Sequence, residues 1–341
     1  MTRRSLLIIS LTVSLATFGF AQSTVTKTFT ISGTTNSCVW HAPSGISKPP
    51  VVFFIHGANG SGGAFESETK GDVVADREKF IAVYPSASSN GGAGIWNDMS
   101  GTTNYPFFLA VIDTLDKRYT IDRKRVYMTG FSQGGFISFV AGCKYSDVFA
   151  AIAPVSGHAG SPCALKHLVP VFLTFGGQED QASFISDINI WLKLDSCPST
   201  PTVTHPATGI TKVSYGPCAQ GTYVIMDSVS GQGHQWPNKQ NQAEEVWAFF
   251  KPYSLGGTTA AYAHISDAAR QPMSALYASG IVRLQGAGEK VQVRVIDPKG
   301  REVAAVSAVQ GQFAFKDKPS GVYMVIVNGH NRIFSLRIVV P

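Results

Sequence analysis

A serine and a histidine about a hundred residues apart have local sequences that suit nucleophilic catalysis. Ser132 is the centre of Gly130-Phe131-Ser132-Gln133-Gly134, between the apolar runs 125–129 and 136–141. This order predicts a strand, a sharp turn at Ser132 and a helix, with glycines where side chains would collide. His234 lies in Gly231-Gln232-Gly233-His234-Gln235-Trp236-Pro237, after an apolar run. The pair indicates acyl transfer, with Ser132 as nucleophile and His234 as base.

The carboxylate that orients such a histidine is expected after the predicted strand 171–175. That segment reads Gly176-Gly177-Gln178-Glu179-Asp180, between the serine and the histidine in chain order, as in α/β-hydrolases. Both acids fit. Aspartate is the commoner residue type in triads, whereas the distance from the strand suits Glu179. We therefore expect Asp180, with Glu179 as the alternative.

Two backbone amides are candidates for stabilising an oxyanion. One belongs to Gln133, directly after the nucleophile, and the other to Ala58 in the loop His56-Gly57-Ala58-Asn59-Gly60, which follows the predicted strand 51–55. His56 is expected to be a hydrogen-bonding loop residue. The histidines are scattered and no spacing resembles a zinc signature, so we expect neither a metal nor another cofactor.

The first 21 residues predict a secretory signal peptide. Arg3 and Arg4 precede the apolar stretch 6–18, and the segment ends with small residues near a plausible cleavage site. Polar residues interrupt the apolar stretch, and no later segment is long and apolar enough to span a bilayer. A net charge of +6, with charged residues at only 15% and no dense basic run, gives little support to nucleic-acid binding. These features favour a protein that is secreted or held at the cell surface.

Five cysteines occur in this export context, where disulfides persist. Cys197 and Cys218 flank a polar, proline-containing loop ahead of the strand that precedes His234, so a bond between them would fix the base of the histidine loop. Cys143 with Cys163 is the second expected pair. At least one cysteine lacks an intrachain partner.

The elements around these residues predict an α/β-hydrolase fold over residues 22–254. Strand-like runs at 51–55, 80–84, 126–129, 150–155, 171–175 and 223–229 alternate with helical patterns at 106–118, after Ser132 and at 241–251. Such alternation predicts a mostly parallel sheet with helices on both faces. Residues 255–271 resemble a linker, and short runs between turns over 272–341 predict a small antiparallel β-sandwich.

The sequence resembles a group of secreted esterases. The His56-Gly57 loop, the segment Ile121 to Gly135, the run Phe149 to Gly157 and Gly233-His234-Gln235-Trp236-Pro237 are similar to the feruloyl esterase, acetylxylan esterase and polyhydroxybutyrate depolymerase group, broadly carbohydrate esterase family 1. The resemblance covers most of residues 24–253. It implies Ser132 as nucleophile, His234 as base and a disulfide at Cys197 and Cys218.

The C-terminal region resembles the sorting domain of type IX secretion cargo, in 295–300, 319–323 and 333–340. The resemblance implies that secretion machinery is a partner. An accessory carbohydrate-binding or spacer sandwich is the alternative.

Together these observations predict a serine carboxylesterase that cleaves feruloyl or acetyl esters on plant cell-wall xylan. Trp96 and Trp236, with other aromatic residues, are candidates for lining the substrate groove. A polyhydroxyalkanoate depolymerase with the same triad is the alternative activity. A catalytically inactive carbohydrate-binding protein is the alternative of another class.

Overall fold

The computed structural model describes residues 21–88, 94–96, 104–160, 163–258, 274–278, 280–285, 290–297, 301–329 and 332–340. The expected signal peptide, except Ala21, lies outside these residues, as does most of the expected linker 255–271. The backbone forms two compact units, residues 1–262 and 263–341. Among the helices of the described residues, none has the length and apolar character required to cross a membrane.

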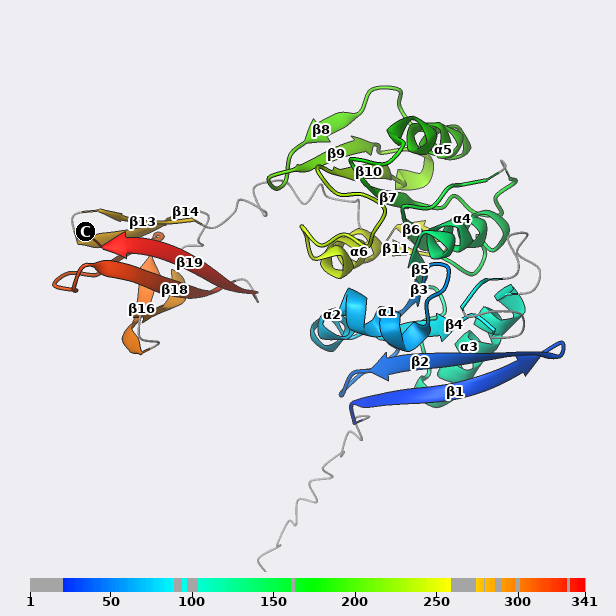
Figure 1. Ribbon diagram of the computed structural model, residues 1–341, viewed down its shortest axis with the longest axis horizontal. Helices are drawn as coiled ribbons and strands as arrows, with labels where there is room; N and C mark the ends of the chain where they lie inside the picture. Colours follow the sequence, from blue (N-terminus) through cyan, green and yellow to red (C-terminus); the bar gives the residue numbers. More distant parts are fainter. Residues whose placement is uncertain are drawn as a thin grey trace, which may run out of the picture. The chain divides into compact units, whose positions relative to one another are not determined.

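The first unit is built on a ten-stranded sheet, in the order β1-β2-β4-β3-β5-β6-β7-β10-β9-β8 (Figure 1). The six strands from β4 to β10 in this order are parallel, and antiparallel hairpins complete both edges. The strands are β1 (Ser23–Ile31), β2 (Thr34–Ala42), β3 (Val51–Ile55), β4 (Ile81–Ser86), β5 (Val126–Phe131), β6 (Ala151–Val155), β7 (Val171–Gly176), β8 (Thr202–Thr204), β9 (Ile210–Tyr215) and β10 (Val224–Val229).

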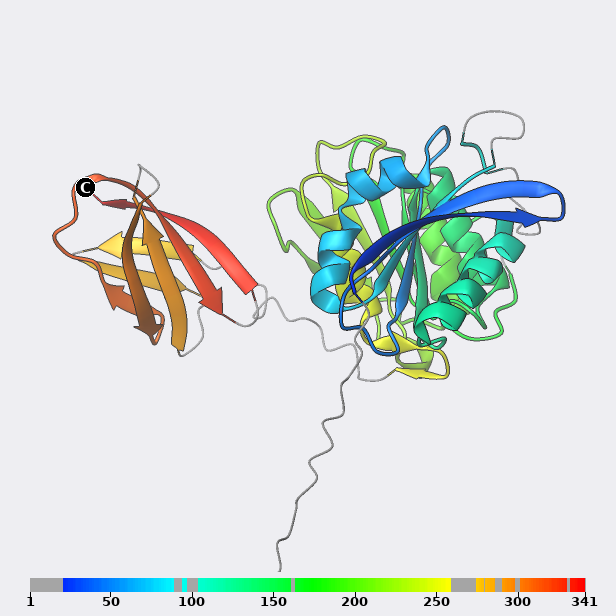
Figure 2. The ribbon, with the colours of Figure 1, turned by 90° about the horizontal axis from the view of Figure 1, so that it is seen from below.

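Helices cover both faces of this sheet, as Figure 2 shows. On one face lie α1 (Gly62–Thr69), α2 (Gly71–Glu78) and α6 (Gln242–Phe250), and on the other α3 (Asn104–Tyr119), α4 (Gln133–Lys144) and α5 (Gln181–Leu194). The central strand β3 shows why both layers form. Its five residues are all buried, with Val51, Phe53 and Ile55 in one core and Val52 and Phe54 in the other. The predicted α/β-hydrolase fold, with a mostly parallel sheet, is confirmed.

Several elements at the periphery were not expected from the sequence. They are the hairpins β1–β2 and β8–β9, the helix pair α1–α2, helix α5, the 3-10 turn Ala219–Gly221 and the two-stranded sheet of β11 (Tyr253–Ser254) and β12 (Gly257–Thr258). The edge strands contain residues of very different burial, because one of their faces is exposed to solvent or covered by only one helix. Their hydrophobic periodicity is therefore weak.

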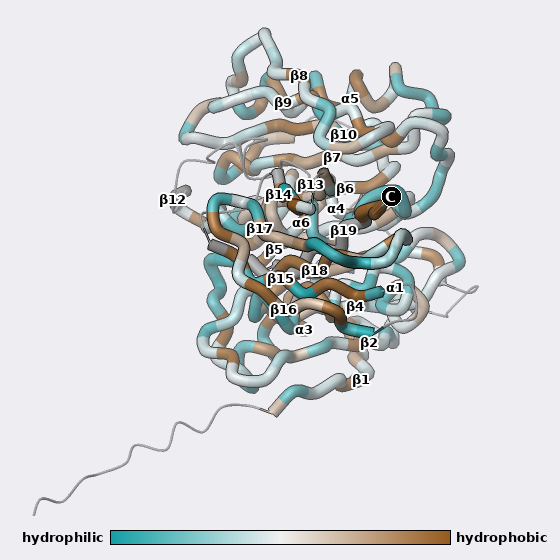
Figure 3. Tube along the Cα trace, turned by 90° about the vertical axis from the view of Figure 1, so that its left-hand side faces the viewer, coloured by the Kyte–Doolittle hydropathy of each residue, from teal (hydrophilic) through white to brown (hydrophobic). Residues whose placement is uncertain are grey.

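The second unit contains one seven-stranded antiparallel sheet, in the order β13-β14-β17-β16-β15-β18-β19. The predicted small antiparallel C-terminal unit is confirmed, and because β13 also lies against β19, its single sheet curls around its own core. Apolar stretches of β15, β16 and β18 are brown in Figure 3. The strands are β13 (Ser274–Ala278), β14 (Ile281–Gln285), β15 (Lys290–Ile296), β16 (Glu302–Val309), β17 (Gln312–Ala314), β18 (Gly321–Gly329) and β19 (Arg332–Val340).

Candidate active site

Ser132 lies at the sharp turn between β5 and α4. Its backbone has φ 56° and ψ −114°, a conformation that L-residues adopt only where the surroundings enforce it. The turn is tight, because a Cβ atom at Gly134 would lie 2.1 Å from the carbonyl oxygen of Ile55 and one at Gly130 would lie 2.5 Å from that of Gly134. The glycines that flank the serine are therefore required by the close approach of β3, β5 and α4.

A continuous relay of hydrogen bonds joins Ser132 to a carboxylate through His234. The Oγ atom of Ser132 is 2.8 Å from Nε2 of His234, and Nδ1 of His234 is 2.7 Å from Oε1 of Glu179. The phenyl ring of Phe131 lies against the imidazole, with 4.8 Å between ring centroids. The imidazole is half exposed, whereas the Glu179 side chain is only 10% exposed. This arrangement can remove a proton from a serine hydroxyl and hold the resulting imidazolium.

Backbone hydrogen bonds hold the loop that carries the acid to the loop that carries the base. The amide of Gly177 donates to the carbonyl of Val229 at 2.8 Å, and the amide of Gln178 donates to that of Gln232 at 3.0 Å. The amide of Glu179 donates to the carbonyl of Gly176 and closes a turn. This turn directs the Glu179 side chain toward Ser156, which follows β6. Because β7 and β10 are adjacent parallel strands, these two loops leave the sheet side by side.

Asp180, the acid that the sequence favoured, has another role, and the alternative Glu179 occupies its expected place. Asp180 is the N-cap of α5, where its carboxylate accepts from the amide of Ala182 and the hydroxyl of Ser183. The hydroxyl of Ser183 is the main cause that lowers the pKa of Asp180. The Asp180 carboxylate is thus bound by the first turn of α5, whereas the imidazole of His234 is bound to Glu179. The choice of Asp180 is therefore corrected to Glu179.

Ser156 is a site residue that the sequence analysis did not single out. Its hydroxyl donates to Oε2 of Glu179 at 2.7 Å, and the amide of Gly176 donates to the same oxygen at 2.7 Å. Ser156 directly follows β6 and has a positive φ of 48°. Its place at the carboxyl end of a central strand was the available signal. Both donors fix the orientation of the Glu179 carboxylate.

The loop after β3 lies directly against the nucleophile. A Cβ atom at Gly57 would lie 3.3 Å from that of Ser132, and the next residue, Ala58, is exposed. The neighbouring His56 is buried. Its Nε2 accepts from the amide of Ala87, so Nδ1 carries the proton that is donated to the carbonyl of Gly57. Burial is the main cause that lowers the pKa of His56, so it is a neutral structural residue.

The two tryptophans expected in a substrate groove are buried instead. Trp96 is 1% exposed, stacks on His56 and donates from its indole nitrogen to the carbonyl of that residue. The side-chain amide of Gln133 binds both backbone groups of Trp96, at 3.0 and 2.9 Å. Trp236 is 6% exposed and packs edge-on against Phe65. Their rings support the loops around the site and present no open stacking surface.

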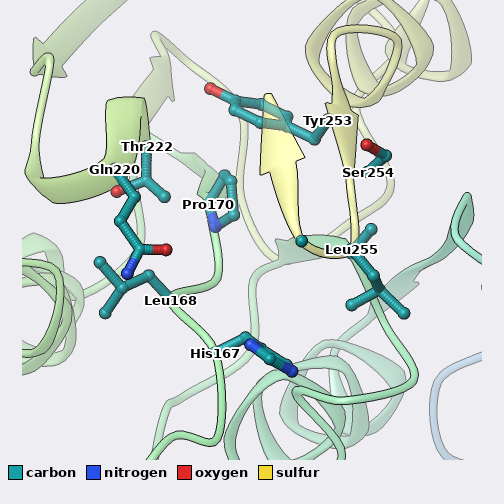
Figure 4. Close-up of a pocket in the computed structure, with 10 residues that line it drawn as sticks. His167, Leu168, Pro170, Gln220, Thr222, Tyr253, Ser254 and Leu255 are labelled. Carbon is teal, nitrogen blue, oxygen red and sulfur yellow. The ribbon is translucent and has the colours of Figure 1, made fainter. Parts of the chain in front are cut away.

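No group of three or more metal-ligating side chains was found within the described ranges. A cavity of about 50 Å³ lies at the amino-terminal end of the parallel strands (Figure 4). It is lined by residues that precede parallel strands, such as Pro170 before β7, together with Tyr253 and Leu255. Ser132 follows its strand, so this cavity is separate from the triad.

Two disulfides join the expected cysteine pairs, Cys143 with Cys163 and Cys197 with Cys218. The second connects the segment after α5 with the turn before β10, the strand that leads to the histidine loop. Cys38 is a buried free thiol, and burial raises its pKa far above the ordinary range.

Comparison with known proteins confirms the esterase resemblance. Residues 37–203 match the family model described as esterase PHB depolymerase. The chain is 30% identical over 236 residues to a bifunctional acetylxylan esterase/xylanase of Neocallimastix patriciarum, a match that covers 65% of this chain and 34% of that protein. It is also 30% identical over 125 residues to poly(3-hydroxyalkanoate) depolymerase C of Paucimonas lemoignei, a match that covers 34% and 30%. The chain thus spans about a third of the length of these relatives.

Solved structures share the fold. An acetyl xylan esterase from Aspergillus awamori superposes with a TM-score of 0.54 at 16% identity, over 67% of this chain and 99% of that one. A feruloyl esterase module from Clostridium thermocellum superposes with a TM-score of 0.50 at 17% identity, over 67% and 87%. The resemblance of residues 272–341 to a sorting domain stays a prediction.

Proposed function

We propose that this protein is a serine carboxylesterase that uses Ser132, His234 and Glu179 as its triad. The observation that carries the proposal is the relay of two short hydrogen bonds, 2.8 Å from Ser132 to His234 and 2.7 Å from His234 to Glu179. A serine in a constrained turn, a half-exposed imidazole and a nearly buried carboxylate are the three components that acyl transfer to serine requires.

In the first half-reaction, Nε2 of His234 takes the proton of Ser132 as Oγ attacks the ester carbonyl. The imidazolium donates from Nδ1 to Oε1 of Glu179, whose other oxygen accepts from Ser156 and Gly176. The Glu179 carboxylate stabilises the charged imidazole through this hydrogen bond. His234 then returns the proton to the departing alcohol, and an acyl group stays on Ser132.

In the second half-reaction, His234 takes a proton from a water molecule that attacks the acyl carbon. The bond between that carbon and Oγ of Ser132 then breaks, His234 returns the proton to Oγ, and the acid is released. The proposed donors to the oxyanion are the amides of Gln133 and Ala58. Two observations support them: Gln133 directly follows Ser132, and the backbone of Gly57, next to Ala58, is so near Ser132 that a Cβ atom added there would lie 3.3 Å from the Cβ atom of Ser132. One such donor contributes about 10²–10³-fold to kcat in well-studied hydrolases.

We propose acetyl or feruloyl esters on plant cell-wall xylan as the substrates. This part of the proposal rests on the acetylxylan and feruloyl esterases among the relatives, because the expected aromatic groove is not formed by Trp96 and Trp236. The match to the esterase PHB depolymerase family model favours an aliphatic polyester as the second candidate. We further propose that residues 22–254 form the catalytic domain of an exported protein and residues 272–341 an accessory or sorting domain.

Turnover of p-nitrophenyl acetate, methyl ferulate, acetylated xylan and a short-chain polyhydroxyalkanoate by the purified chain tests the proposal. We expect turnover of the first ester that is lost in Ser132→Ala, together with activity on acetylated xylan or methyl ferulate. Turnover of the polyester alone would transfer the assignment to the second candidate. Retention of polysaccharide without turnover of any ester, by folded protein, would contradict the esterase and favour a binding protein.

A further inference from the structure

The sheet carries an uncovered stretch beside the candidate active site, at the edge formed by β8 and β9 (Figure 1). Helix α5 packs on β7 and β10, and its residues Phe184, Ile188 and Trp191 are buried. Among the described residues no helix packs comparably on β8 or β9. The face of β8 and β9 that lies on the α5 side of the sheet is therefore not covered by a helix of the described residues.

Strand register identifies the side chains on this open face. Val203 of β8 pairs with Val213 of β9, which pairs with Met226 of β10. Two residues further toward the carboxyl end of β10, Ser228 pairs with Thr211 of β9 and with Phe175 of β7. Directly paired residues share one face of a sheet. Phe175 stacks on Phe184 of α5, so both rows lie on the α5 side.

Val213 and Met226 of the first row, and Thr211, Ser228 and Phe175 of the second, line a cavity of about 340 Å³ together with Gln181 and Ile185 of α5, and Val203 continues the first row beyond this lining. Ile185 and Val203 are large apolar side chains with exposures of 46% and 53%. None of the nine residues that line the cavity is charged. The opposite face of β9 and β10 differs sharply, because Lys212 there lies 3.4 Å from carboxylate oxygens of both Asp227 and Glu245.

The cavity adjoins the loops that carry two members of the triad. Gly177, at its rim, belongs to the turn that positions Glu179. Ser230, also at the rim, begins the loop that ends at His234. A long substrate whose ester reaches Ser132 can thus extend over the acid and base loops onto this face.

We propose that this surface, defined by Ile185, Val203, Thr211, Val213 and Ser228 and called the α5 platform, binds a neutral saccharide chain several units from the reacting ester. The assignment rests on the proposed esterase function and specifies its substrate class. A pyranose chain presents C–H faces and hydroxyl groups in alternation, which matches an apolar row beside a row of hydroxyls. An aliphatic polyester offers acceptors but no donors, so the acceptor lone pairs of the Thr211 and Ser228 hydroxyls gain no partner from it.

Calorimetric titration of xylohexaose into full-length Ser132→Ala tests the α5 platform without any need for turnover. We expect saturable binding that weakens about fivefold or more in Ile185→Asn and in Val203→Asn, because each removes apolar contact area from the ligand. Val73→Asn is the matched control, since Val73 lies in α2 on the other face of the sheet and is 63% exposed. In the parent with Ser132 intact, the two platform variants should raise KM for acetylated xylo-oligosaccharides and leave p-nitrophenyl acetate turnover unchanged.

The binding and kinetic results separate two failures. Parent protein without p-nitrophenyl acetate turnover would remove the proposed function, whereas the xylohexaose titration would still report on the α5 platform. No xylohexaose binding at millimolar concentration, or binding equally strong in the platform variants and in Val73→Asn, would overturn the assignment. Binding of a hydroxybutyrate oligomer in place of xylohexaose would also overturn it, and would assign the surface to a polyester.

Discussion

The Oε1 atom of Glu179 lies 2.7 Å from Nδ1 of His234, although the adjacent Asp180 is the commoner type of triad acid. The two carboxylates have different partners because helix α5 begins directly after Asp180. Glu179 points back to Ser156 and Gly176, and Asp180 points forward to cap the helix. One position along the chain thus distinguishes a residue that orients the base from one that begins a helix.

Replacement of each acid by its amide should have very different effects. Glu179→Gln removes the negative charge beside the imidazole, so kcat/KM for p-nitrophenyl acetate should fall by about 10²–10⁴-fold. Asp180→Asn keeps a good helix cap and should leave the rate within about twofold. Steady-state kinetics on the two variants decide the matter. A larger loss in Asp180→Asn than in Glu179→Gln would refute the assignment of Glu179.

Ser156→Ala should cause a smaller, specific loss of rate. It removes one of the two donors to Oε2 of Glu179, while the amide of Gly176 remains. A neutral donor to a carboxylate predicts a fall in kcat of roughly three- to tenfold, with KM little changed. Ser67→Ala, which removes an exposed hydroxyl in α1, is the control. Equal kcat values in the two variants would show that Ser156 does not act through Glu179.

Asp195 should make stability depend on pH. Burial is the main cause that raises its pKa from 3.8 to about 7, against smaller opposing contributions from Thr222 and the backbone of Val169. A raised folded-state pKa stabilises the fold below pH 3.8, and this contribution is lost as the pH rises toward 7 and above, by at most about 1.4 kcal/mol per pH unit. The free energy of unfolding of Asp195→Asn, relative to that of the parent, should therefore increase as the pH rises from 5 to 8. Urea unfolding at both pH values measures this difference, and an identical difference at the two values would contradict the prediction.

Loss of the Cys197–Cys218 disulfide should destabilise the chain. The bond closes a loop with a sequence separation of 21 residues between α5 and β10. In the chain-entropy description, replacing both cysteines with serine should cost about 2–4 kcal/mol. Thermal unfolding of the double variant should show a lower Tm than that of the parent under oxidising conditions. The same Tm in both proteins would indicate that the bond adds nothing to stability.

The sequence predicted the features that depend on local pattern. Ser132 was identified because a strand, a glycine-flanked serine and a helix follow one another within about twenty residues. The choice between Glu179 and Asp180 depended on where α5 begins, because Asp180 caps that helix. The sequence analysis did not predict α5, so the role of Asp180 as its cap was missed.

The burial of Trp96 and the exposure of Val203 also depend on tertiary neighbours. The local sequence around an aromatic residue does not show whether its ring lines a groove or supports a loop. The two hydrogen bonds between the Gln133 side chain and the backbone of Trp96 show that Trp96 supports a loop. The strand β8 has three residues and mostly exposed side chains, so its periodicity is too short to detect.

The most direct test of the account is covalent labelling with a fluorophosphonate, followed by intact-mass measurement and peptide mapping. The reagent phosphonylates a serine hydroxyl that a neighbouring base has activated. We expect one adduct per chain, located on Ser132, absent in Ser132→Ala and formed much more slowly in His234→Ala. An adduct on a different residue, or no adduct on folded parent protein, would contradict the assignment of Ser132 as an activated nucleophile.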